Sequence, residues 1–153
     1  MTVGTTPFDE LIEVVDRGPH AETAFLQIAD GRYRPAHSPW ARFVDDVAER
    51  ASAADVVVTH AGAGSVFALL QAGRMPVVVP NLVRRDGHQV ELLRWLEARR
   101  YAIVAHSVDE VNGLVERHAR LQGELRPFDV ERFFFGAELN ADLRAAVARL
   151  PRR

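Results

Sequence analysis

The sequence predicts an α/β fold in which helices cover both faces of a parallel sheet. Short apolar segments alternate with amphipathic, helix-like segments along the chain, which is the order that βαβ units require. Valine runs at 56–58 and 77–79 are typical of strands buried on both faces. Two glycine-containing turns each follow a strand and precede a helix, at the sheet edge where open α/β folds bind ligands.

The first half of the chain is expected to open with a very short strand at 1–4, followed by a helix at 6–16. Thr6 is the expected N-cap of that helix and Pro7 its first residue. Its apolar residues recur with helical spacing on one face. The elements expected next are a strand at 24–29, a loop at 35–40, a helix at 42–54 and a strand at 55–60.

The second half continues the same alternation. A helix at 64–73 is expected to end at Gly73. Ser107 and Glu110 have the spacing of a capping box at the start of a helix at 107–123. The other expected elements are a strand at 75–80, a helix at 87–99, a strand at 101–105 and a last helix at 136–150.

Length and composition limit the classes of protein to which this chain can belong. The 153 residues suit one domain at 1–153, for which we expect a core at 1–122 and a capping or partner-docking segment at 123–153. A net charge of −2 argues against general nucleic-acid binding, so no nucleic-acid partner is expected. The absence of cysteine excludes disulfides, thiolate nucleophiles and cysteine-ligated zinc.

Metal sites and membrane spans are not expected either. The histidines lack zinc-binding spacing, and His20, His37, His106 and His118 are expected at the surface. No apolar run approaches the ~20 residues of a membrane-spanning helix. The first ten residues do not have the pattern of a signal peptide. We therefore expect a cytoplasmic location.

The two glycine turns have the composition of phosphate-binding turns. Glycine allows the backbone to approach a ligand closely, and the start of the following helix offers unpaired N–H groups and a partial positive charge. A single such turn is as well explained by turn shape alone, whereas two at one sheet edge favour an anion. The first turn consists of Gly4, Thr5 and Thr6, and the second of Gly62, Ala63, Gly64 and Ser65.

Other nucleotide-binding patterns fit less well. The dinucleotide fingerprint requires a small third residue where this chain has Phe67, and the acidic residue expected after the next strand is missing. No G-K-S/T sequence occurs, so a Walker-type loop is absent. An oxidoreductase or another α/β enzyme remains an alternative with little support.

Three segments resemble the C-terminal domain of glycosyltransferase family 28. They are TVGTTPFDELIEVVD, ADVVVTHAGAGSVFALLQAGRMPVVVP and RDGHQVELLRWLEARRYAIVA, which together span about residues 2–105. Their order and spacing make the resemblance specific. It is nearest to the stand-alone, donor-binding subunits of two-part UDP-sugar transferases, which act in dolichol-linked glycan or bacterial exopolysaccharide synthesis.

The resemblance implies a Rossmann-like domain that is the C-terminal half of a GT-B glycosyltransferase. The implied reaction is an inverting transfer of a sugar from UDP to a lipid-linked acceptor, with no cofactor and no essential divalent metal. The implied partners are the UDP-sugar and a separate, membrane-associated subunit that binds the acceptor. That subunit would recruit the chain to the cytoplasmic face of the membrane. It is also expected to supply the catalytic base, so no catalytic residue is assigned to this chain.

The resemblance also implies roles for individual residues. The two glycine turns would hold the diphosphate, with His60 beside them. In RFVDD the backbone of Val44 would pair with uracil, and Phe43 would lie near the base. In DGHQ the side chains of His88 and Gln89 would contact the transferred sugar. Asp86 belongs to the same loop, and we expect it to cap the helix at 87–99.

One departure from the family pattern raises a second hypothesis. The acidic residue that grips the ribose hydroxyls is replaced by Ala68 in this alignment. The chain would then be a non-catalytic assembly subunit with weakened donor binding. Three consecutive phenylalanines at 133–135 cannot all face inward from one element, so the segment is expected either to cap the core or to dock the acceptor-binding subunit.

Overall fold

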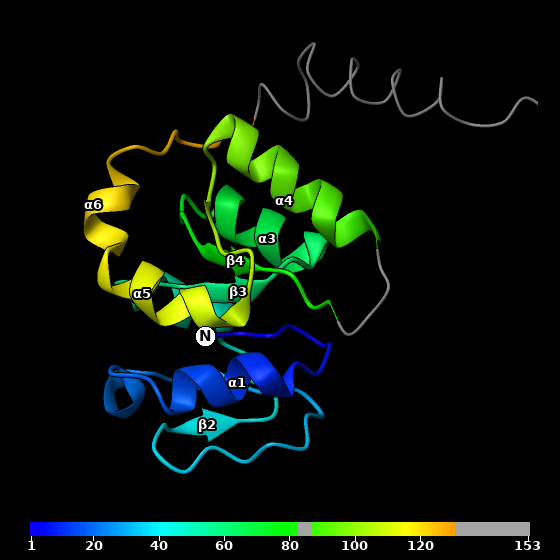
Figure 1. Cartoon of the computed structure of the whole chain (residues 1–153), viewed down its shortest axis with the longest axis vertical. Coiled ribbons are helices and arrows are strands. Elements are labelled where there is room, and N and C mark those ends of the chain that lie inside the picture. The colour runs from blue at the N-terminus through cyan, green and yellow to red at the C-terminus, as the bar shows by residue number, and fades with distance from the viewer. Residues whose placement is uncertain (83–86, 131–153) are drawn as a thin grey trace, which may run out of the picture.

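The computed structural model describes residues 1–82 and 87–130 (Figure 1). Its strands are parallel and helices lie on both faces of the sheet, as predicted. The strands are β1 (Leu26–Gln27), β2 (Trp40–Ala41), β3 (Val58–His60), β4 (Val77–Val79) and β5 (Ile103–Val104). The helices are α1 (Asp9–Asp16), α2 (Val47–Ala53), α3 (Ala63–Gln71), α4 (Gly87–Arg99), α5 (Val111–Glu116) and α6 (His118–Gln122), with short 3₁₀ turns η1 (Ala21–Thr23) and η2 (Val108–Glu110).

Thr2 joins the two parts of the sheet. It forms parallel bridges to Gln27 of β1 on one side and to Thr59 of β3 on the other. The order across the sheet is therefore β2-β1-Thr2-β3-β4-β5. The chain adds β1 and β2 on one side of Thr2 and then crosses to add β3, β4 and β5 on the other side. The topological switch point, where such sheets bind ligands, consequently lies between Thr2 and β3.

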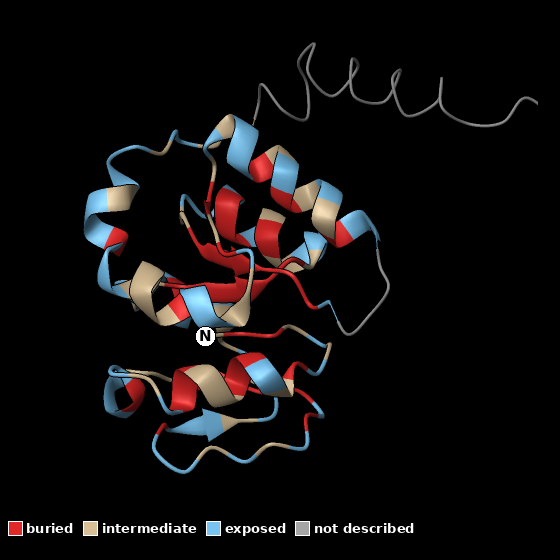
Figure 2. Ribbon diagram, viewed as in Figure 1, coloured by how far each residue is buried: buried red, intermediate tan, exposed pale blue. Residues whose placement is uncertain are grey.

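The alternation of side chains along β4 divides the core into two layers. Buried residues lie in the strands and in the helices on both faces of the sheet (Figure 2). Val77 and Val79 pack with α1 and α5, whereas Val78 packs on the opposite face with α3 and α4. This alternation is what the period of a strand dictates, and both layers are filled because the valine run has no polar member. The described core therefore rests on a sheet that is buried on both faces.

The first helix begins later than predicted. Phe8, not Thr6, is the N-cap of α1, and Phe8 has the non-helical angles φ −148° and ψ 70°. The Thr6 N–H donates to the Val3 carbonyl, and this hydrogen bond closes a turn before the helix. Phe8 is buried in the core, so the chain bends at Phe8 to place this ring before the helix starts.

The predictions for 35–54 were partly wrong. Residues 40–41 form the edge strand β2 rather than the end of a loop, and α2 starts at Val47 rather than at Arg42. Backbone hydrogen bonds to β1 hold the chain extended as far as Arg42, whose carbonyl accepts from the Ala29 N–H. A two-residue strand leaves no periodic signal in the sequence, which is why β2 was missed.

The segment at 107–123 is not one continuous helix. It consists of η2, α5 and α6, and no side-chain capping bond forms at Ser107. Glu110 instead accepts from the His106 N–H. The break at Arg117 turns His118 inward, where its Nε2 lies 3.2 Å from the Met75 carbonyl oxygen. His118 is therefore buried and not at the surface as predicted.

A feature that sequence patterns did not predict is the wrapping of the loop at 30–38 around two carboxylates of α1. Asp9 and Asp16 are seven residues apart and so share a helix face. The Asp9 carboxylate accepts from the N–H groups of Arg32 and Tyr33. Asp16 is fully buried and accepts four hydrogen bonds, from the N–H groups of Ala36, His37 and Ser38 and from the Tyr33 hydroxyl.

The chain beyond α6 returns to the second core layer. The Arg126 N–H donates to the Arg100 carbonyl, and the Phe128 ring lies against Tyr101 and Phe67 at centroid distances of 5.2 and 6.1 Å. The helix expected at 136–150 and the phenylalanine run at 133–135 lie outside the described residues. Among residues 1–82 and 87–130, no helix combines the length and apolar character needed to span a bilayer.

Candidate functional site

The two glycine turns meet at the switch point. A Cβ atom on Gly4 would lie 2.9 Å from the Ser65 Oγ of the other turn and 3.2 Å from Cε1 of His60. Gly4 has φ +59°, which only glycine adopts without strain. The parallel sheet brings these turns together because each follows one of two adjacent strands.

Helix α3 offers the more favourable end for an anion. Its N-cap is Gly62, no side chain caps it, and its first turn has no acidic residue. Helix α1 also lacks a side-chain cap, but its first turn contains Asp9 and Glu10. The partial positive charge of a helix N-terminus is thus available at α3 and opposed by carboxylates at α1.

A cleft of about 240 Å³ opens at this edge. It contains residues from both turns and from the start of α4, so the structure brings together segments that are more than 80 residues apart. Of the predicted site residues, Thr6, His60, Gly62, Ala63, His88 and Gln89 line it. Ala61 and Leu92 also line it and were not predicted, because an alanine and a leucine in apolar patterns give no functional signal.

His60 is buried at this cleft. Burial lowers the pKa of its imidazole below the usual 6.5, because the charged form loses solvation. Its Nδ1 is buried without a hydrogen-bond partner in the part of the chain that the structure describes. The other ring nitrogen, Nε2, lies beside Gly62, so the ring occupies the space between the two glycine turns.

The predicted sugar loop is joined to the end of β4. Gln89 is buried, and its Oε1 accepts from the Asn81 N–H at 2.9 Å. His88 is exposed and its Nδ1 lies 3.9 Å from a carboxylate oxygen of Glu91. The role of both residues in sugar binding stays a prediction. Asp86 lies outside the described residues.

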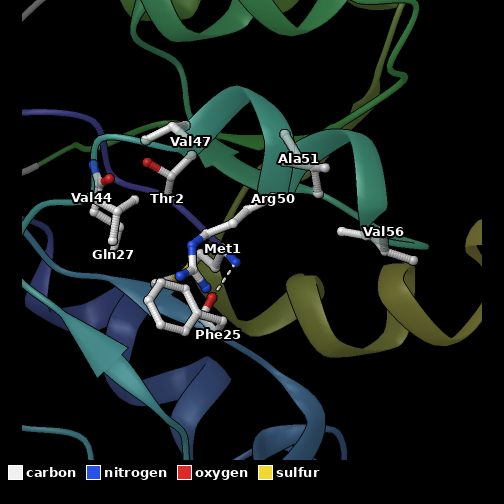
Figure 3. Close-up of a pocket in the computed structure, with 11 residues that line it drawn as sticks. Met1, Thr2, Phe25, Gln27, Val44, Val47, Arg50, Ala51 and Val56 are labelled. Carbon is white, nitrogen blue, oxygen red and sulfur yellow. Dashed lines mark hydrogen bonds between the residues drawn. The ribbon is translucent and has the colours of Figure 1, made fainter.

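The predicted base-binding segment follows β2 at the same sheet edge. Phe43 is 50% exposed there. Val44 instead lines a separate pocket between α2 and the sheet, together with Thr2, Gln27 and Phe25 (Figure 3). This pocket measures about 50 Å³ and is mostly apolar. It is smaller than a cavity that holds a six-membered ring, which measures about 150 Å³. Neither Phe43 nor Val44 lines the cleft that contains the two glycine turns.

Two positions of α3, Gly64 and Ala68, face outward. A Cβ on Gly64 would meet nothing within 4 Å, and Gly64 and Ala68 are both exposed on α3. Ala68 lies one helical turn after Gly64, so an acidic side chain at 68 would project from the same face. Within the described residues, no group of three or more histidines and carboxylates is arranged to hold a metal ion.

Comparison with known proteins shows the family of this chain. The model of the glycosyltransferase family 28 C-terminal domain matches residues 1–122. The chain is similar to the UDP-N-acetylglucosamine transferase subunit ALG13 of Yarrowia lipolytica, with 32% identity over 128 residues that cover 72% of this chain and 65% of that protein. The human protein of the same name is 34% identical over 113 residues, covering 63% of this chain and 10% of its own length.

A bacterial relative shares a shorter region. The UDP-N-acetylglucosamine–N-acetylmuramyl-(pentapeptide) pyrophosphoryl-undecaprenol N-acetylglucosamine transferase of Sorangium cellulosum is 36% identical over 80 residues, or 52% of this chain and 20% of that protein. The chain thus spans about two thirds of the yeast relative and much less of the other two. The family match covers most of the chain and includes both glycine turns, β3, β4 and α4. This chain belongs to glycosyltransferase family 28, in which it corresponds to the C-terminal, Rossmann-like domain.

Proposed function

We propose that this chain is the donor-binding, catalytic subunit of an inverting glycosyltransferase that uses a UDP-sugar. The main support is the meeting of two glycine turns at the switch point, with the His60 imidazole between them. Anions bind where free N–H groups and the positive end of a helix coincide, and α3 provides both. We propose that two adjacent turns hold the two phosphates of a diphosphate.

The proposed chemistry places the charge of the leaving group at this cleft. An acceptor hydroxyl attacks the anomeric carbon, the bond to the diphosphate oxygen breaks, and UDP leaves with the bonding electrons. Negative charge then increases on the diphosphate, where fixed N–H donors stabilise it more in the transition state than in the ground state. The hydroxyl proton passes to a base that we assign to the acceptor-binding subunit.

The relatives and the size of the cleft support the choice of donor and the proposal of a partner subunit. Both named groups of relatives are UDP-N-acetylglucosamine transferases, which makes UDP-N-acetylglucosamine the first donor to test. The cleft of about 240 Å³ is smaller than the 300–1,000 Å³ of typical ligand pockets, which supports a site completed by a second subunit. We propose that this subunit holds a lipid-linked acceptor and recruits the chain to the cytoplasmic face of a membrane.

Calorimetric titration tests this proposal. The full chain is titrated with UDP and UDP-N-acetylglucosamine, alone and with an acceptor-domain protein from the same genome, and with NADH as the comparison ligand. We expect saturable heat with the uridine nucleotides and none with NADH. Absence of heat with every uridine nucleotide under both conditions would contradict the proposal, and heat with NADH alone would favour an oxidoreductase.

The exposed Ala68 favours one alternative, a non-catalytic assembly subunit. A carboxylate that accepts two ribose hydroxyls contributes about 1.5–3 kcal/mol, so its absence weakens donor binding about tenfold or more. The substitution Ala68→Glu decides this. A gain of tenfold in UDP affinity together with new transfer activity supports a subunit that lost its function. Normal wild-type affinity and no effect of the substitution remove the basis of the alternative.

A further inference from the structure

The first glycine turn is held from both sides by buried side-chain amides. Gln27 Nε2, from β1, donates to the Gly4 carbonyl at 3.1 Å. Asn81 Nδ2, from the segment after β4, donates to the Pro7 carbonyl at 3.1 Å. The two carbonyls bracket the turn, and each hydrogen bond spans a large sequence separation.

Burying both amide side chains costs free energy. Gln27 is 6% and Asn81 3% exposed, and Gln27 Oε1 and Asn81 Oδ1 are buried without a partner in the part of the chain described. An unsatisfied buried polar atom costs about 1–3 kcal/mol, which is comparable to or larger than the gain from the single hydrogen bond that each amide makes to the turn. Stability alone therefore does not explain why amides stand at these two positions.

We propose that Gln27 and Asn81 are positioning residues for the diphosphate of the donor. By drawing the Gly4 and Pro7 carbonyls into the protein, the two amides keep the negative ends of these dipoles away from the cleft. Thr6 then lines the cleft at this turn. Thr5, the residue before Thr6, is exposed. A carbonyl oxygen turned toward the cleft would repel a diphosphate, so the orientation of this turn decides whether an anion binds.

Asn81 has a second connection that supports this role. Its backbone N–H donates to Gln89 Oε1 at 2.9 Å, so it joins the first turn to the start of α4. Gln89 and Thr6 line the same cleft. Asn81 consequently fixes the distance between the segment proposed to hold the diphosphate and the segment proposed to hold the sugar.

The inference rests on the proposed function, and one experiment separates the two. The affinities of UDP and of uridine are measured by ligand-observed NMR for the full chain and for Gln27→Met and Asn81→Leu, which keep the side-chain volume and remove the donor. We expect UDP to bind about tenfold more weakly to each variant and uridine to bind within twofold of wild type. A wild-type chain that does not bind UDP contradicts the proposed function itself.

Asn112, on α5, provides a matched control. Its Nδ2 donates to the Val14 carbonyl at 3.0 Å, near the far end of α1 from the glycine turn. Asn112→Leu is expected to lower stability and to leave both affinities unchanged. The inference is overturned if UDP binding is unchanged in both test variants, if uridine binding falls as much as UDP binding, or if Asn112→Leu has the same effect. It is also overturned if neither test variant folds, because the amides would then serve stability.

Discussion

The imidazole of His60 lies directly against Gly62, two residues further along the chain. A Cβ atom on Gly62 would stand 2.7 Å from Cε1 of this ring and closer still to Nε2. Gly62 has ordinary extended angles, φ −87° and ψ 119°, so its backbone would accept any residue. The ring alone requires glycine here, which ties the second glycine turn to a particular position of the histidine.

Gly62→Ala is therefore expected to displace His60. Forcing an extra methyl group into a packed site costs about 1–3 kcal/mol, which urea denaturation would measure. We also expect UDP affinity to fall about tenfold. In the double variant with His60→Ala most of the stability loss should be recovered, because the clashing ring is gone. An additive double variant would show that the methyl group clashes elsewhere.

Gly64→Ala provides the comparison. Gly64 is exposed in the first turn of α3, and a Cβ there meets nothing within 4 Å. We expect the free energy of unfolding to rise by about 0.5–1 kcal/mol, since alanine has the higher helix propensity. A stability loss similar to that of Gly62→Ala would show that the two turn glycines are equivalent, contrary to the structure.

His60 should make donor binding depend on pH. Its folded-state pKa lies below 6.5, so the unfolded chain takes up a proton more readily. The free energy of unfolding is therefore insensitive to His60 above pH 6.5 and falls as the pH drops below that value. A bound diphosphate acts in the opposite direction and raises the pKa of the imidazole.

We accordingly expect proton uptake when UDP-N-acetylglucosamine binds at pH 6, and stronger binding at pH 6 than at pH 8. Calorimetry in two buffers of different ionisation enthalpy measures the uptake. It should disappear in His60→Asn and persist in His37→Asn, which lies in the loop around α1. Equal uptake in the two variants would show that a different group binds the proton.

Asp16 should stabilise the fold in a pH-dependent way. Burial raises the pKa of its carboxyl, but the hydrogen bonds from the loop outweigh this and lower the pKa to about 2. Its contribution is thus fully present above pH 3.8, the ordinary value, and is lost as the pH falls through 2. Asp16→Asn should lower the free energy of unfolding by about 2 kcal/mol at pH 7.

The difference between Asp16→Asn and wild type should shrink steadily between pH 4 and pH 2, as followed by urea denaturation. Asp46→Asn is the control, because Asp46 pairs with Arg50 in an exposed i,i+4 bridge and its loss should not be measurable. A difference that stays constant down to pH 2 would mean that packing, not charge, holds the loop.

Phe128 should stabilise the second core layer although it lies after the family match at 1–122. Its half-buried ring contacts those of Phe67 and Tyr101. Phe128→Ala is expected to lower the free energy of unfolding by about 2 kcal/mol, less than for a fully buried ring. Glu124→Ala, at an exposed position, should change it by less than about 0.5 kcal/mol. Equal values for the two would place Phe128 outside the folded core.

The sequence by itself determined the fold class and the bounds of α4, because valine runs and helical periodicity depend only on local order along the chain. It also determined which turns carry glycine. Only the tertiary structure decided the start of α1, the edge strand β2 and the burial of His118, since each depends on hydrogen bonds to distant segments. The same holds for Gln27 and Asn81, because their amides reach carbonyls 23 and 74 residues away and no local pattern records such a contact.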